Sequence, residues 1–182
     1  MDFKSKHGLV TRISVLALCL LLFAAGDGFA NDVGIGTTTA TVVAALTVTA
    51  AASLAFGNVY AGVAKTVAND DAAAGVFTVA GTAGDVFQAF LNLPEYLWST
   101  TANQRLDLTF TDTDAAIDLT GNVDPDTHGQ GSTDPRGLGS ITLPAGGSVA
   151  IFLGGKVTPK AYQAAAADYT ADIVLTVWYE GT

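Results

Sequence analysis

The chain has 182 residues, a formal net charge of −9 and one cysteine. Hydrophobic residues make up 49% of it and charged residues only 14%, a balance that excludes a disordered chain and fits one domain or two small ones. The acidic charge argues against nucleic acid or an anionic membrane surface as the main partner, because both attract lysine and arginine. A chain that is both acidic and hydrophobic indicates a membrane protein, a large core or a surface that is buried against another body.

The N-terminus has the three parts of a secretory signal peptide. Basic residues come first, an apolar run follows over residues 13–25, and the small residues Gly28 and Ala30 mark a cleavage site. The apolar run is shorter than the roughly 20 residues that a membrane-spanning helix needs. We therefore expect residues 1–30 to be a cleaved leader, and an uncleaved anchor helix is the alternative.

Cleavage of the leader changes the net charge and the cysteine content of the chain. It removes three of the eight basic residues and two of the seventeen acidic ones, so the mature chain keeps 5 and 15 and a net charge of −10. It also removes Cys19, which lies in the apolar run. An exported chain without disulfides depends on packing and strand pairing for its stability. The mature chain is expected to have no membrane span.

The mature chain is predicted to consist of an N-terminal extension, residues 31–45, and a folded domain, residues 46–182. Residues 37–50 (TTTATVVAALTVTA) alternate between polar and apolar side chains and are rich in β-branched residues, which predicts a strand. This segment is longer than the usual strand of about 5–6 residues, so it either bends between sheets or takes part in two pairings. Eight further strands are expected between glycine, asparagine and proline turn signals, at residues 53–56, 75–80, 86–93, 105–111, 117–120, 139–143, 149–153 and 169–179.

The remaining segments give no helical signal. Residues 161–167 are alanine-rich and form one helical turn or a loop, and residues 121–138, rich in Gly, Asp and Pro, are expected to form a long surface loop. Many short strands with regular turns favour an all-β fold, either a sandwich or a barrel. In the last predicted strand, residues 169–179, successive side chains alternate between the two faces, and the strand ends close to the end of the chain. A sandwich with such a last strand has an edge that is an aggregation template unless it is covered.

Several stretches together resemble a family of bacterial secreted domains. Residues 54–62 (LAFGNVYAG) resemble its opening pattern, residues 79–94 (VAGTAGDVFQAFLNLP) its second strand pair, and residues 153–159 (LGGKVTP) with residues 168–179 (DYTADIVLTVWY) its closing motif. The family is domain of unknown function 4402, related to Mat-type fimbrial and spore-coat-protein-U-like subunits. The resemblance extends from about residue 46 to residue 179.

The resemblance implies an immunoglobulin-like β-sandwich that lacks its last strand and receives it from the N-terminal extension of the next subunit. The partners are then further copies of this chain in a head-to-tail polymer, with a periplasmic chaperone and an outer-membrane usher as assembly partners. Two features depart from the pilin pattern, because three residues follow Tyr179 and the mature chain has no disulfide. The candidate donor side chains are Val42, Ala44 and Leu46. The candidate acceptor edge is Ile173, Leu175, Val177 and Tyr179.

Catalytic chemistry finds little support. His128, the only histidine after the leader, lies with Asp126 and Ser132 on one loop, whereas a catalytic triad needs side chains that converge from rigid elements. We therefore expect no enzyme and no cofactor, and interpret His128 as an exposed loop residue. Tyr96 and Trp98 are either packing residues or a platform for stacking a sugar.

Aspartates are concentrated between residues 112 and 134, and calcium takes several oxygen ligands. An EF-hand loop counted from Asp124 fails, because Pro135 stands where the closing glutamate belongs. Turn-forming aspartates are the alternative, since Asp-Pro pairs occur at residues 124–125 and 134–135. The calcium candidates are Asp112, Asp114, Asp124, Asp126 and Asp134.

The sequence therefore predicts an exported bacterial protein that reaches the cell surface through the periplasm. There it is expected to be a structural subunit of an extracellular fibre, polymerising by donor-strand complementation and binding no nucleic acid. The alternative is a monomeric secreted β-sandwich module that binds carbohydrate or calcium. In that module residues 37–48 would form an ordinary strand of their own domain.

Overall fold

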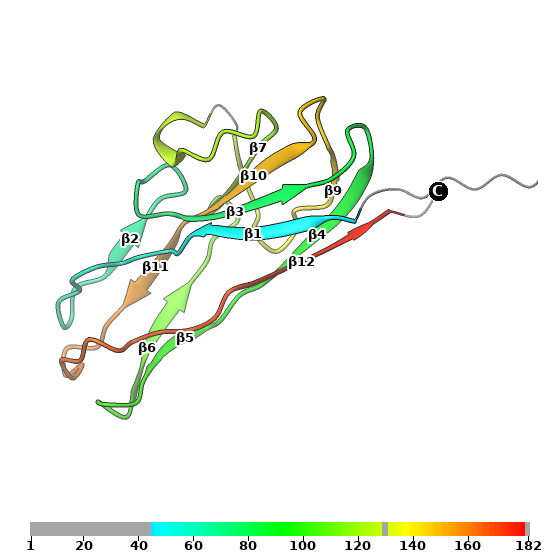
Figure 1. The fold of residues 1–182 in the computed structure, drawn as a ribbon. Coiled ribbons are helices and arrows are strands. Elements are labelled where there is room, and N and C mark those ends of the chain that lie inside the picture. The colour runs from blue at the N-terminus through cyan, green and yellow to red at the C-terminus, as the bar shows by residue number, and fades with distance from the viewer. Residues whose placement is uncertain (1–44, 129–130, 181–182) are drawn as a thin grey trace, which may run out of the picture. The chain divides into compact units, whose positions relative to one another are not determined.

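The computed structural model describes residues 45–128 and 131–180, all within the unit Val42–Thr182 (Figure 1). The described residues form twelve strands and one short 3-10 helix, η1 (Pro125–Thr127), and all strand pairings between them are antiparallel. The all-β fold class is thereby confirmed. None of these residues forms a helix long and apolar enough to cross a membrane. The predicted leader and residues 31–44 of the extension lie outside the described residues.

The strands form three sheets, which we call A, B and C. Sheet A has the order β1-β3-β10-β7-β8, sheet B the order β2-β11-β6-β5, and sheet C the order β12-β4-β9. The strands of sheet A are β1 (Thr47–Ala52), β3 (Gly75–Ala80), β7 (Ala115–Asp118), β8 (Ser132–Thr133) and β10 (Ser148–Leu153). Those of sheets B and C are β2 (Lys65–Val67), β4 (Val86–Asn92), β5 (Tyr96–Ser99), β6 (Gln104–Thr109), β9 (Ser140–Thr142), β11 (Gly155–Thr158) and β12 (Val174–Tyr179).

The main core lies between sheet A on one side and sheets B and C on the other, as expected for a β-sandwich. Sheet A contributes alternate residues of β3 and β10, and the opposite layer contributes alternate residues of β4 and β6. Among the buried core residues are Phe77, Val79, Val149, Ile151 and Leu153 from sheet A, and Phe87, Ala89, Leu91, Leu106 and Leu108 from the opposite layer.

Strand β10 is buried on both faces. Val149, Ile151 and Leu153 enter the main core, while Ala150 and Phe152 belong to a second apolar cluster on the outer face of sheet A. This two-sided burial explains why residues 149–153 read as a continuous apolar run rather than an alternating one.

The chain passes directly from sheet A into sheet B at Gly154, between β10 and β11. A Cβ atom on this glycine would lie 2.5 Å from the Val67 carbonyl oxygen and 2.8 Å from the Asn69 amide nitrogen. Backbone packs against backbone here, and no flexible side chain can move aside. The crossing between the layers therefore requires a residue without a side chain.

Seven of the eight further strand predictions correspond to observed strands, with ends that differ by up to five residues, and the prediction for residues 37–50 overlaps β1 at residues 47–50. The prediction for residues 53–56 is wrong, because the chain leaves sheet A after a bulge between Ala50 and Ala52. The predicted loop over residues 121–138 contains η1 and the two-residue strand β8, and residues 161–167 form turn and loop. The sequence reading missed β2, β5, β8 and β11, each of four residues or fewer.

The close packing at Gly154 leads to a stability prediction. Substitution Gly154→Ala forces apart the backbone where the chain crosses between the layers and is expected to lower the free energy of unfolding by about 2–3 kcal/mol, as overpacking does. Gly137→Ala is the matched control, because a Cβ atom there meets nothing within 4 Å. Urea denaturation of both variants measures the difference. Equal unfolding midpoints would contradict the packing argument.

Candidate functional site

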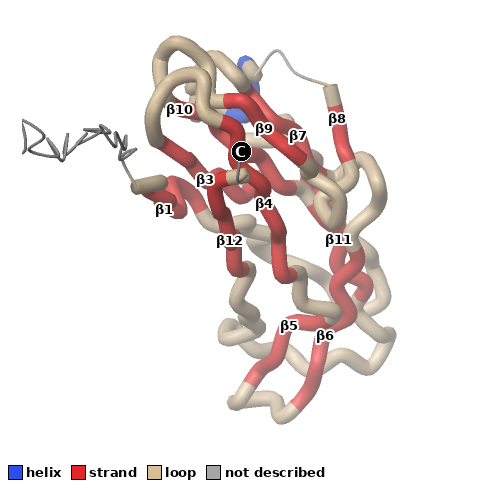
Figure 2. The backbone as a smooth tube through the Cα atoms, turned by 90° about the vertical axis from the view of Figure 1, so that its right-hand side faces the viewer, coloured by secondary structure: helices blue, strands red, loops and turns tan. Residues whose placement is uncertain are grey.

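The first and last strands of the domain are the outer strands of their sheets. Strand β1 pairs only with β3 in sheet A, and β12 pairs only with β4 in sheet C, among the residues that the structure describes. Both strands lie on the same side of the domain in the two views of Figures 1 and 2. Each therefore leaves one row of backbone N–H and C=O groups without a strand partner in the described chain.

The inward face of β1 is uncovered. Val48 is opposite Val79 and Ala50 is opposite Phe77 in the strand register, so both face the side of sheet A that carries the core. Val79 is completely buried, whereas Val48 is 39% exposed and Ala50 is also exposed. Sheet A thus extends beyond the layer that covers it.

The inward face of β12 shows the same incomplete cover. Leu175, Val177 and Tyr179 pack against the core but stay half-buried. Their direct partners on β4 are buried almost completely, with exposures between 0% and 7%: Leu91, Ala89 and Phe87. The core residues of β4 are therefore buried, whereas those of the next strand, β12, are partly exposed to solvent.

One end of this open edge is closed. The side chains of Leu46, Leu143 and Tyr179 converge on Gly81, where a Cβ atom would lie 2.9 Å from each of them. Leu46 is half-buried and packs against the core of its own domain. Leu46, a predicted donor residue, therefore lies against the core of its own domain in this structure.

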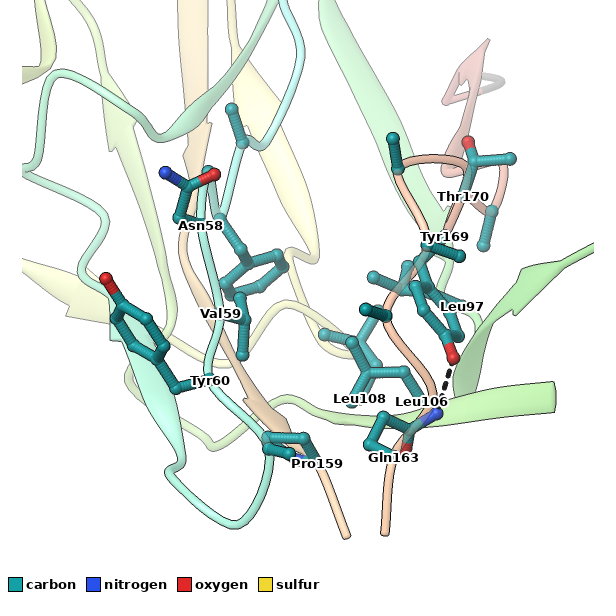
Figure 3. A pocket seen from close by; sticks show the side chains of 18 of the residues that line it. Asn58, Val59, Tyr60, Leu97, Leu106, Leu108, Pro159, Gln163, Tyr169 and Thr170 are labelled. Atoms are coloured by element: carbon teal, nitrogen blue, oxygen red, sulfur yellow. Dashed lines mark hydrogen bonds between the residues drawn. The ribbon is translucent and has the colours of Figure 1, made fainter. Parts of the chain in front are cut away.

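The other end opens into a cavity of about 690 Å³ (Figure 3). One wall is the segment after β1, residues 54–61, and the other is the segment before β12, residues 163–173. Leu97, Leu106 and Leu108 also line it and connect it to the core. We call the open side between β1 and β12, together with this cavity, the edge groove.

Hydrogen bonds fix the second wall of the cavity. The Gln163 amide donates to the Tyr169 hydroxyl at 2.7 Å, the dashed line in Figure 3, and this hydroxyl donates to the Ala164 carbonyl at 2.9 Å. The alanine-rich residues 164–167 between them present small side chains to the cavity. The cavity therefore has a fixed frame and a lining with spare volume.

Asp168 connects this wall to the turn between β5 and β6. Its carboxylate accepts hydrogen bonds from the Ser99 hydroxyl at 2.5 Å, the Thr100 hydroxyl at 2.8 Å and the Thr101 backbone N–H at 2.9 Å. These donors, Ser99 first, then the Thr101 N–H and the Thr100 hydroxyl, hold the pKa of the Asp168 carboxyl well below its usual range. The ionised side chain thus fixes where the chain turns toward β12.

The predicted acceptor residues fall together on this groove. Ile173 lines the cavity, and Leu175, Val177 and Tyr179 follow it along the inward face of β12. The predicted donor residues Val42 and Ala44 lie outside the described residues. The sequence did not predict the cavity, because its two walls are more than one hundred residues apart in the chain.

The calcium candidates form turns. The carboxylates of Asp114, Asp124 and Asp134 accept hydrogen bonds from nearby backbone N–H groups of Thr111, Asp126 and Arg136. Asp112 is exposed, as is Asp126. No group of three or more acidic, histidine or cysteine side chains within the described residues is arranged to hold a metal ion. The geometry favours the alternative of turn-forming aspartates.

The interpretation of His128 as an exposed loop residue is wrong. Its ring is half-buried and stacks on Phe152, with ring centres 4.6 Å apart and an angle of 17° between the planes. The loop thereby covers the outer apolar cluster of sheet A, which explains the two-sided burial of β10. His128 thus packs on the outer face of sheet A.

No family model, no curated protein and no solved structure matches the chain. The resemblance to the domain of unknown function 4402 family therefore stays a prediction.

The hydrogen bonds of Asp168 give a pH prediction. A carboxyl whose pKa is lower in the folded than in the unfolded state stabilises the fold above its unfolded-state pKa of about 3.9, and this contribution is lost as the pH falls toward the folded-state pKa. We expect Asp168→Asn to lower the urea midpoint at pH 7 and to lower it much less at pH 2.

Asp112→Asn is the control for this prediction, because the exposed Asp112 side chain accepts no hydrogen bond within the described residues. It should leave the urea midpoint at pH 7 close to that of the wild type. A loss in Asp168→Asn that is equally large at both pH values would show that the carboxylate charge is not what fixes the turn.

Proposed function

We propose that this protein is an exported structural subunit of a bacterial extracellular fibre, and that residues 31–44 of one copy fill the edge groove of the next. The observation that carries the proposal is the incomplete cover of the core between β1 and β12, where inward-facing Val48 is 39% exposed. An added strand would pair with the outer backbone edges of β1 and β12 and place alternate side chains over the core. Each Val or Ile side chain buried in this way contributes about 1.5–3 kcal/mol.

The length of the extension supports this occupant. Fourteen residues in an extended strand span about 46 Å, at about 3.3 Å per residue. The inward face of β12 from Ile173 to Tyr179 needs about 20 Å on the same scale. The remainder is long enough to reach along the cavity beyond Ile173.

Turn chemistry favours donation to another copy over folding back onto the same domain. To lie beside its own β1, the extension would have to reverse direction just before Thr47. Residues 37–46 contain no Gly, Pro, Asn or Asp, the residues that tight turns use. The last glycine before β1 is Gly36, which leaves only five residues of the extension to fold back. A head-to-tail contact of this kind joins two different surfaces, so it propagates into an open filament.

Removing the extension tests the proposal. A chain that begins at Ala45 is expected to remain monomeric under conditions in which the mature chain forms fibres, because its groove has no strand to receive. A synthetic peptide of residues 31–44 should bind the shortened chain one to one. Analytical ultracentrifugation and electron microscopy measure assembly, and isothermal titration measures the peptide. Fibres from the shortened chain would rule out donor-strand assembly.

The peptide also tests the register. With Val42 and Ala44 facing inward, a peptide with Val42→Asp should bind at least about tenfold more weakly, because it buries a charge in the groove. Thr41→Asp, on the opposite face of the same strand, should cost much less. If Thr41→Asp weakens binding more than Val42→Asp does, the register is shifted by one residue and Thr41 lies in the groove.

A second variant blocks the groove without changing the extension. Ala171 lines the cavity and is half-buried, so Ala171→Trp is expected to fill the cavity and to reduce fibre formation at least about tenfold while the monomer stays folded. Ala145→Trp, at an exposed turn outside the cavity, is the control and should assemble normally. Normal assembly of Ala171→Trp would show that the cavity is not part of the interface.

The monomeric module is the competing function. It would be favoured if the mature chain remains a monomer and the amides of residues 37–44 are protected from hydrogen exchange, because the extension would then pair within its own domain. Hydrogen exchange of a monomeric fraction separates the two functions directly.

A further inference from the structure

A second hollow, of about 240 Å³, lies where β5 and β6 meet the loop after β11. It shares only Gln163 with the cavity of the edge groove. Its lining combines two aromatic rings, two cations and three side-chain amides: Trp98, Tyr162, Arg105, Lys160, Asn103, Gln104 and Gln163.

The two aromatic side chains of the hollow are exposed to solvent. Trp98 is 41% exposed and Tyr162 is 75% exposed. The Trp98 backbone is nonetheless fixed from both sides, because it pairs with Arg105 on β6 and exchanges two hydrogen bonds of 2.9 and 3.0 Å with Thr170. A large apolar ring kept exposed on rigid backbone presents a flat surface to a ligand at little cost in conformational entropy.

The cations of the hollow are unusual in this acidic chain. Only five basic residues follow the leader, and two of them, Arg105 and Lys160, line this hollow. Neither forms an ion pair with a carboxylate in the described part of the chain. The Arg105 guanidinium lies 5.5 Å from the centre of the Tyr96 ring, and Asp107 is the nearest acidic residue along β6. The local positive charge therefore complements an anion.

Two of the side-chain amides of the hollow, Gln104 and Gln163, are held by hydrogen bonds, and the third, Asn103, is available to a ligand. The Gln104 side-chain oxygen accepts from the Ala164 N–H at 3.0 Å, and Gln163 is held by the Tyr169 hydroxyl. Asn103 sits at the turn with a φ of 51°, and its side chain has no hydrogen-bond partner among the described residues. The hollow thus offers a hydrogen-bonding group beside the rings and the cations.

We propose that this hollow binds a sugar that carries a carboxylate, a uronate residue of an extracellular glycan. The pyranose ring would stack on Trp98 and Tyr162, the carboxylate would pair with Lys160 and Arg105, and the hydroxyl groups would bond to Asn103. This site shares only Gln163 with the edge groove and needs no donated strand, so the proposal holds whether or not the chain forms fibres.

Fluorescence gives a direct test, because Trp98 and Trp178 are the only tryptophans. In a Trp178→Phe background of the mature chain, emission then reports on the hollow alone. Trigalacturonate is expected to change this emission in a saturable way, and the neutral galactose trisaccharide to bind at least about tenfold more weakly. Lys160→Gln and Arg105→Gln should each weaken trigalacturonate binding about tenfold, the size of one hydrogen bond to a charged group.

Two matched variants separate the site from general charge effects. Lys65→Gln removes the same charge from β2, at the opposite edge of sheet B from β5, and should change the affinity less than about twofold. Asp107→Asn removes a negative charge beside the hollow and should strengthen binding. Tyr162→Ala, measured by isothermal titration, tests stacking at a loop position where folding does not depend on the ring.

Several results would overturn the proposal. They are no saturable change with trigalacturonate, equal binding of the neutral trisaccharide, equal binding of tripolyphosphate, and a loss in Lys65→Gln as large as that in Lys160→Gln. Fibre formation of the Arg105→Gln and Lys160→Gln variants is expected to match that of the parent chain. Failure of sugar binding and failure of fibre assembly are therefore distinguishable.

Discussion

Burial of the core between two layers is the constraint on which this structure depends, and it is incomplete along β1 and β12. The partners of β12 on β4 are sealed, while the inward side chains of β12 stay half-buried and those of β1 stay exposed. A β-sandwich gains its stability from apolar area removed from water. An added strand that covers these exposed side chains would therefore stabilise the fold further. The closed end at Gly81 and the cavity at residues 54–61 are the two ends of one incomplete surface.

Much of the fold could be predicted from the sequence, because alternation is a local signal. It located the core strands from residues 75–80 to residues 149–153, and it identified the inward face of β12 at Leu175, Val177 and Tyr179. Strands of two to four residues, such as β2 and β8, are too short to show a period. The cavity could not be predicted, because its walls meet only through the tertiary fold. Alternation gives the spacing of side chains along a strand and not the domain in which they pack, so it could not show that Leu46 lies against the core of its own domain.

Aspartate shows how one residue type takes different roles in this chain. In the loops between residues 111 and 136, carboxylates accept N–H groups two or three residues away and form turns. Asp168 instead accepts three donors from a segment almost seventy residues earlier in the chain. A count of acidic residues finds the first group and overlooks the second, because only the fold brings Ser99, Thr100 and Thr101 to Asp168.

The crossing at Gly154 also gives the domain a direction of mechanical strength. A single run of chain, β10 followed by β11, occupies interior positions of sheet A and then of sheet B, so covalent bonds join an interior strand of one layer to an interior strand of the other. Force that slides one layer along the other must stretch this connection as well as break hydrogen bonds. Strand β12 is held by β4 along one side only, so force that peels it outward breaks its bonds one after another. A pull along the strands therefore meets a stiff body, and a sideways pull at its last strand meets a soft one.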